Sequence, residues 1–262
     1  LASIPPSKGE IATFLAWQNS QLEKNGVSVH LGSEAEVATI DALDPDVVIV
    51  ATGARPMALR VPGISGKNVV SAFDVLDGRV QTGENVVVVG GGMVGAETAN
   101  HLANHGKNVT IVEMLSTIAT DEQPSARLHL LHALEERHVV VDTNTVVKEV
   151  LDTGIVAVNG KESLISADTV VLAVGATPVN ELVEKLRGKP YQVVTVGDAK
   201  AVRKVMAAVT EGFFAGLEIA KIAAMIESGN TTIDVVDVDA PTLLQGCDEG
   251  IFEKIDWDQI GP

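Results

Sequence analysis

Gly90, Gly92 and Gly95 follow a valine-rich run and have the spacing GxGxxG. In this pattern the first glycine permits a tight turn, the second leaves main chain bare beside a pyrophosphate, and the third lets a helix pack against a strand. A helix that begins here points the N–H groups around Met93 and Val94 at phosphate oxygens. The sequence therefore predicts a dinucleotide-binding turn. The alternative is a glycine turn that only packs.

A carboxylate stands where such a turn needs one. Glu113 ends the next apolar run, 108–113, and lies 18 residues after Gly95. At this place a carboxylate accepts hydrogen bonds from both ribose hydroxyls and repels a 2′-phosphate. We therefore expect NAD(H) rather than NADP(H), unless Glu113 is simply solvated.

Three further turns follow apolar runs. ATGARP at 51–56 and AVGATP at 173–178 each place a glycine at a strand end, where a ligand can approach the backbone closely. Each of these segments, taken alone, is more often a plain strand-to-loop turn, but their occurrence as a pair around the dinucleotide motif favours a ligand-binding role. VGDA at 196–199 places Asp198 just after a strand, where its carboxylate can accept hydrogen bonds from ribityl hydroxyls or can cap a turn.

The elements that must position these residues alternate between β-branched apolar runs and helical patterns. This alternation predicts an α/β fold, with a parallel sheet covered by helices. The first helix is expected to begin at a capping box, Ser7 to Glu10, and to end before Gly26. Other strands are expected at 27–31, 46–51, 85–89, 169–174 and 193–196, a hairpin around 152–154, and helices at 96–105, 125–136 and 204–226.

Composition narrows the class of protein. The chain has 262 residues, 46% of them hydrophobic, and carries 35 acidic against 19 basic residues, a net charge of −16. That charge argues against nucleic acid and anionic lipid as partners, because both are bound through Lys and Arg. No apolar run reaches the roughly 20 residues of a membrane span, and the start does not resemble a signal peptide. With a single cysteine, Cys247, this predicts a cytoplasmic protein with no internal disulfide and no iron–sulfur cluster of its own.

Two histidines are candidate metal ligands. His101 and His105 have the spacing of a zinc pair, but Leu102 stands where the HExxH pattern needs its glutamate. We therefore predict no metal site, and no spacing in the chain indicates a general acid or a nucleophile.

The four glycine motifs, in this order, resemble those of the two-dinucleotide flavoproteins related to the pyridine-nucleotide-disulfide oxidoreductases. The stretches LASIPPSKGEI at 1–11 and DVVIVATGARP at 46–56 more closely resemble the C-terminal half of bacterial NADH:flavin oxidoreductases of the 2,4-dienoyl-CoA reductase and 2-enoate reductase type. The resemblance covers about residues 1–222.

The resemblance implies a Rossmann-like NAD(H)-binding domain at 80–180, inserted in an FAD-binding domain formed by 1–79 and 181–230, with an acidic arm at 231–262. Thr52, Gly53, Gly197 and Asp198 would lie near FAD. Glu97 and Gly175 would lie near the nicotinamide end, beside the glycine turn and Glu113.

The family's first GxGxxG, its cysteine run and its barrel do not occur in this sequence, so the FAD-binding domain is incomplete. We expect a fragment or subunit whose other portion, with FMN and an iron–sulfur cluster, lies on another segment or chain, and a homo-oligomer is possible. The expected reaction passes hydride from NADH to FAD and onward to an activated C=C bond. The alternatives are a reductase of a protein acceptor such as ferredoxin, and a non-catalytic NAD(H)-binding subunit.

Overall fold

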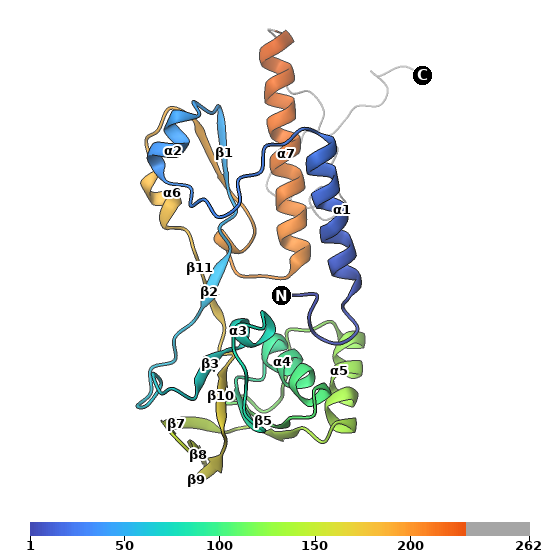
Figure 1. Cartoon of the computed structure of the whole chain (residues 1–262), viewed down its shortest axis with the longest axis vertical. Helices are drawn as coiled ribbons and strands as arrows, with labels where there is room; N and C mark the ends of the chain where they lie inside the picture. The colour runs from blue at the N-terminus through green and yellow to red at the C-terminus, as the bar shows by residue number, and fades with distance from the viewer. Residues whose placement is uncertain (229–262) are drawn as a thin grey trace, which may run out of the picture. The chain divides into compact units, whose positions relative to one another are not determined.

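The computed structural model describes residues 1–228, and Figure 1 shows how their elements are arranged. By their contacts, Leu1–Ala215 form one unit and Gly216–Pro262 another, whose described part is the end of the last helix. The predicted acidic arm, 231–262, lies outside the described residues. In chain order the elements are α1 (Glu10–Lys24), α2 (Val37–Ala42), β1 (Val47–Val50), β2 (Ala54–Pro56), β3 (Val69–Ser71), α3 (Ala72–Leu76), β4 (Asn85–Val89), α4 (Met93–Asn104), β5 (Asn108–Val112), α5 (Pro124–Glu136), β6 (Val140–Asp142), β7 (Val146–Leu151), β8 (Gly154–Asn159), β9 (Lys161–Ser166), β10 (Thr169–Leu172), β11 (Ala176–Pro178), α6 (Glu181–Lys185), β12 (Gln192–Thr195), the 3-10 turn η1 (Gly197–Ala199) and α7 (Val205–Ser228).

A five-stranded parallel sheet, in the order β3-β10-β4-β5-β6, positions the glycine turn. Its central strand β4 has four consecutive buried valines, as expected of a parallel strand covered on both faces. Helices α3, α4 and α5 cover one face (Figure 1), and their side chains pack on Val86, Val88 and Ile111. The predicted α/β fold with a Rossmann-like sheet is confirmed.

The opposite face of this sheet is covered by an antiparallel meander, β7-β8-β9. Ile155 of β8 packs against Val87 and Val170 of the parallel sheet, and it is fully buried. The hairpin predicted around 152–154 is confirmed, because β7 and β8 are joined there. Strand β9 was not predicted, since its side chains are largely polar and exposed.

The first flanking segment pairs with two later strands. β1 runs parallel to β12 of the second flanking segment, and β2 runs antiparallel to β11, which lies within the predicted 80–180 segment. A small core of Ile40, Val50, Leu186 and Tyr191 forms around the first pair. The five-stranded sheet recruits β3, which precedes residue 80, so it extends beyond the predicted 80–180 segment. The domain boundaries themselves stay a prediction.

Two local predictions at the start of the chain are wrong. Helix α1 has Gly9 at its N-cap and no side-chain cap, because Ser7 adopts a left-handed conformation with φ of 70°. Residues 27–31 form no strand, and Leu31 is 89% exposed, since no described strand lies beside them to complete a ladder. Among the described residues, no helix is long and apolar enough to cross a membrane.

Candidate functional site

The glycine turn between β4 and α4 needs two of its glycines for packing. Gly90 has φ of 100°, and a Cβ atom there would lie 2.5 Å from the carbonyl oxygen of Ala173. A Cβ atom on Gly95 would lie 1.9 Å from the carbonyl oxygen of Gly90. Helix and strand therefore approach more closely here than any side chain allows, as the pattern predicts.

Gly92 is different, because it borders open space. A Cβ atom there would meet only the carboxylate oxygens of Asp121, at 3.8 and 3.9 Å, among the described residues. Gly92 lines a cavity of about 450 Å³ that runs over the turn and the start of α4. The predicted site residues that line this cavity are Gly90, Gly92, Met93, Val94, Glu113 and Gly175. This bare main chain fits the shape that a dinucleotide pyrophosphate requires.

Glu113 braces the turn from the end of β5. The side chain is buried, its Oε2 accepts a hydrogen bond of 2.6 Å from the Gly91 N–H, and its Oε1 accepts one of 2.7 Å from the Leu115 N–H. A carboxylate offers about four acceptor positions, so both oxygens retain capacity for ribose hydroxyls. No lysine, arginine or histidine is among the described residues that line the cavity.

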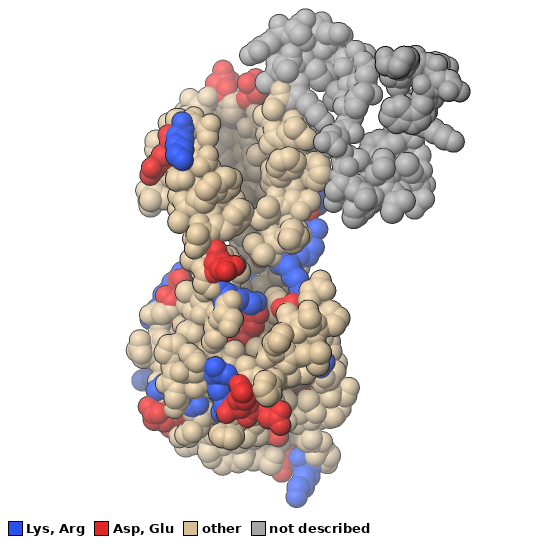
Figure 2. Space-filling view, turned by 90° about the vertical axis from the view of Figure 1, so that its right-hand side faces the viewer, with Lys and Arg blue, Asp and Glu red and all other residues tan. Residues whose placement is uncertain are grey.

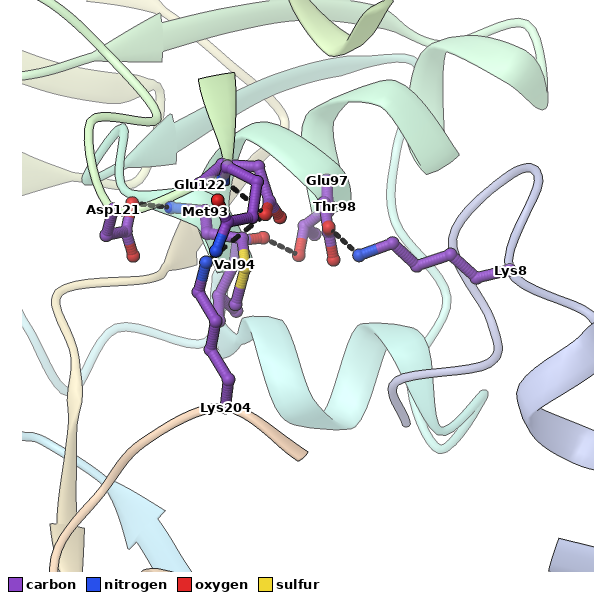
Figure 3. Close-up of polar contacts among 9 residues, drawn as sticks. Lys8, Met93, Val94, Glu97, Thr98, Asp121, Glu122 and Lys204 are labelled. Carbon is purple, nitrogen blue, oxygen red and sulfur yellow. Dashed lines mark hydrogen bonds and ion pairs between the residues drawn. The ribbon is translucent and has the colours of Figure 1, made fainter. Parts of the chain in front are cut away.

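Glu97 does not line this cavity. Its buried side chain points from α4 toward the chain start and forms an ion pair with Lys8 (Figure 3). The nicotinamide-end position that the resemblance implies for Glu97 stays a prediction. Gly175, its predicted companion, does line the cavity.

Sequence reasoning missed a carboxylate at the N-terminus of α4. The Met93 N–H donates a hydrogen bond of 2.8 Å to Oδ1 of Asp121, and beside it Lys204 forms an ion pair of 3.2 Å with Glu122 (Figure 3). Burial raises the pKa of Glu122, but the Gln123 N–H and Lys204 outweigh that effect, so its pKa lies below the ordinary value. No spacing rule connects these residues, because they meet only through the fold.

The four residues predicted near FAD lie on the flanking segments. The Thr52 hydroxyl donates a hydrogen bond to the Val179 carbonyl oxygen. Gly53 has φ of 75°, and a Cβ atom there would meet open space among the described residues. The Gly197 N–H donates to a carboxylate oxygen of Glu211 at 2.8 Å, which fixes the turn after β12. Thr52 and Gly53 line neither of the two cavities described in this subsection.

Asp198 lines a second cavity, of about 420 Å³, that adjoins the first. Met93, Val94 and Gly175 line both cavities, and the second also reaches Lys204. Oδ1 of Asp198 accepts a hydrogen bond of 2.9 Å from the Arg203 N–H. The structure thus places the glycine turn and the predicted FAD-side carboxylate on two neighbouring cavities that share lining residues.

The described residues contain no group of three or more metal-ligating side chains. On the face shown in Figure 2, basic and acidic side chains are interspersed and form no extended basic patch. The open main chain at Gly92 and the buried carboxylate of Glu113 are groups that can hold and orient a ligand.

Comparison with known proteins decides the family. Residues 20–193 match the family described as pyridine nucleotide-disulphide oxidoreductase. The chain belongs to this family. It is a family of flavin-dependent oxidoreductases that use nicotinamide nucleotides. Membership implies binding of FAD and NAD(H), which confirms the two cofactors predicted for this chain.

Several curated relatives cover most of this chain. An NADH oxidase of Thermoanaerobacter brockii is 44% identical over an alignment of 220 residues, and the match covers 81% of this chain and 34% of the relative. A cinnamate reductase of Clostridium sporogenes is 32% identical and covers 83% of this chain and 32% of the relative. The structure of a 2-naphthoyl-CoA reductase in complex with 2-naphthoyl-CoA matches with a TM-score of 0.78 and 30% identity, over 81% of this chain and 33% of its own. The chain spans about a third of the length of these proteins.

Proposed function

We propose that this chain is the pyridine-nucleotide portion of a flavin-dependent oxidoreductase that takes its electrons from NADH. One observation carries the proposal. The cavity over the glycine turn and the cavity that reaches Asp198 share Met93, Val94 and Gly175 in their walls. A nucleotide held over the turn would therefore lie next to the side where the resemblance expects the flavin.

The chain's own contribution is positioning. The bare backbone at Gly92 accommodates the pyrophosphate, Glu113 accepts from the ribose, and Gly175 lies at the junction of the two cavities. When both cofactors are bound, the reduced nicotinamide supplies a hydride, two electrons with one proton, which leaves oxidised nicotinamide and reduced flavin. Holding the two rings in contact is enough for this transfer, so no general acid is required of this chain.

The preference for NADH over NADPH rests on charge. Glu113 is buried beside the cavity, and no cation is among the described lining residues to pair with a 2′-phosphate. A 2′-phosphate placed near this carboxylate would be repelled without compensation. The predicted NAD(H) specificity follows from that repulsion.

The rest of the flavin-binding portion is proposed to lie on another segment or chain. Among the described residues, β1 and β12 form a sheet of two strands, and α1 buries none of its residues. Its apolar side chains stay accessible, with Trp17 57% exposed and Leu15 49% exposed. Such a surface is typical of one that packs against further protein.

The final acceptor is proposed to be an activated C=C bond, as in enzymes of the 2,4-dienoyl-CoA and 2-enoate reductase type. The relative named for cinnamate supports this, because cinnamate carries a C=C bond conjugated to a carboxylate. FMN and an iron–sulfur cluster would belong to the other portion. A cytoplasmic location remains a prediction from composition.

Titration of the purified chain tests the proposal. We expect calorimetry to detect NADH binding. After FAD is added under anaerobic conditions, we expect NADH to bleach the flavin absorbance at about 450 nm. NADPH should be much less effective. Binding of NADH without flavin reduction would favour the non-catalytic subunit, and transfer to a ferredoxin-type protein but not to an enoate would favour the protein-acceptor reductase. A chain that binds no nicotinamide nucleotide would refute the proposal.

A further inference from the structure

The N-terminus of α4 is already covered by an anion of the chain itself. Gly92, the N-cap residue, has no side chain to cap the helix, and the Met93 N–H instead donates to Oδ1 of Asp121 at 2.8 Å. Both carboxylate oxygens lie within 4 Å of the position that a Cβ atom on Gly92 would take. Asp121 lines the cavity over the turn as well as the cavity that reaches Asp198.

The loop that carries Asp121 is held from the other side of the site. Glu122, the next residue, pairs with Lys204 at 3.2 Å, and the Glu122 side chain is only 10% exposed. Lys204 directly follows Arg203, whose N–H donates to Asp198 at 2.9 Å. Figure 3 shows Lys204 reaching the loop from this segment, with Asp121 and Met93 beside it. The predicted flavin-side turn and the nucleotide-side loop are thus tied by one ion pair.

We propose that Asp121 is a displaceable substitute for the nucleotide phosphate, which lowers NADH affinity, and that Lys204 holds it in place through Glu122. The inference rests on the proposed nucleotide site. A helix N-terminus favours one anion, and a backbone N–H that serves Asp121 is not available to a phosphate oxygen. A bound pyrophosphate must therefore move the Asp121 carboxylate or lie against it, at an electrostatic cost.

The main test compares Asp121→Asn with the unaltered chain in titrations with NADH and, separately, with inorganic pyrophosphate. Asparagine keeps an acceptor oxygen for the Met93 N–H but carries no charge. We expect NADH and pyrophosphate to bind about fivefold to tenfold more tightly to this variant, since a like charge is removed. Glu135→Gln, which changes an exposed carboxylate on α5, is the matched control and should leave both affinities unchanged.

The outcomes separate this inference from the proposed function. If the unaltered chain binds NADH but Asp121→Asn binds it no better, the inference is overturned and the proposed function stands. If NADH binds neither protein but pyrophosphate binds the variant more tightly, the proposed function fails and the anion role of Asp121 stands. If neither ligand binds either protein, both are overturned.

The ion pair is tested by a double-mutant cycle. Lys204→Gln should also tighten NADH binding, by about twofold to threefold, because the loop is released. That gain should vanish in the Asp121→Asn background, while Lys200→Gln, which removes a cation paired with Glu211 instead, should have no such effect. Additive gains, or weaker binding in Lys204→Gln, would overturn the role given to Lys204.

Discussion

The Glu113 carboxylate joins three pieces of backbone, because it receives N–H groups from Gly91 and Leu115 while standing at the end of β5. Bracing the turn and accepting ribose hydroxyls are compatible, since a carboxylate has two oxygens with two acceptor positions each. A change at Glu113 should therefore affect the shape of the site as well as its selectivity.

We predict that Glu113→Ala weakens NADH binding by about tenfold or more, because the ribose contact is lost and the N–H groups of Gly91 and Leu115 lose their acceptor. The ratio of NADPH to NADH dissociation constants should fall toward one. Titrations with both nucleotides measure this, with Glu135→Ala as a surface control. Unchanged selectivity would contradict the role given to Glu113.

Gly92 and Gly95 make a matched pair. Gly92 has ordinary backbone angles, φ of −62°, and open space in front of it, so Gly92→Ala should fold normally. We expect this variant to lose NADH affinity by about tenfold or more while its thermal unfolding midpoint stays within about 2 °C. Gly92→Val, with a larger side chain in the same space, should abolish binding.

Gly95→Ala should behave in the opposite way, because its Cβ atom would overlap the Gly90 carbonyl oxygen. We expect a clear fall in the unfolding midpoint, of several degrees. Thermal unfolding followed by circular dichroism measures the midpoint of both variants. Equal destabilisation by the two substitutions would show that Gly92 is needed for packing and not for a ligand.

At the residue scale, the sequence predicted the members of the site that lie in one continuous motif. Gly90, Gly92 and Glu113 follow from a strand, a turn and a second strand, whose spacing is local. Asp121 and Lys204 could not be predicted, because their contacts join segments far apart in the chain and no spacing rule relates them. The ion pair of Glu97 with Lys8 could not be predicted for the same reason, because the two residues lie far apart in the chain.

At the scale of elements, Asp41 ties α2 to the start of β12. Lys189 donates to its Oδ2 at 2.6 Å, and the Tyr191 hydroxyl donates to its Oδ1 at 2.9 Å. The hydrogen bond from Lys189, followed by that from Tyr191, holds the pKa of Asp41 below its usual value. A carboxyl with a lowered folded-state pKa stabilises the fold above its unfolded pKa, and that stabilisation is lost as the pH falls through the folded-state pKa.

We therefore predict that Asp41→Asn makes the free energy of unfolding less dependent on pH below about pH 4. Urea unfolding at a series of pH values measures the slope. Tyr191→Phe removes the weaker of the two donors and should reduce the slope only in part. An identical slope in Asp41→Asn and the unaltered chain would contradict the assignment.

The elements themselves were predictable where the apolar pattern of the sequence is long and continuous. The consecutive valines of β4 and the long apolar helix α7 were evident from the sequence. The strand predicted at 27–31 is wrong, because a β-branched run becomes a strand only when a neighbouring strand supplies the other half of the hydrogen-bond ladder. The meander strand β9 was missed for the opposite reason, since pairing with β8 outweighs its polar composition.

For the whole molecule, charge is the property that solution experiments reach most directly. The chain carries a net charge of −16, and the cavity over the turn has Glu113 and Asp121 among its lining residues. NADH is also an anion, so long-range repulsion opposes its approach and salt screens that repulsion.

We predict that raising NaCl from about 20 mM to about 200 mM leaves NADH affinity unchanged or tightens it by about twofold. Calorimetry at four or five salt concentrations measures this. An uncharged solute at the same osmolality as the salt is the control for osmotic effects. A fall of several-fold would contradict this prediction, because it would indicate that phosphate is held by lysine or arginine.

The parallel pairing of β1 with β12 also constrains how the protein is made. β1 leaves the ribosome well over a hundred residues before its partner is synthesised. At roughly 5–20 residues per second, this delay is on the order of ten seconds. The valines of β1 stay without their ladder during that time, while the central sheet is complete as soon as β10 has been made, before β12 begins. A released chain truncated after residue 191 should therefore resist protease in the central segment and be cleaved around β1.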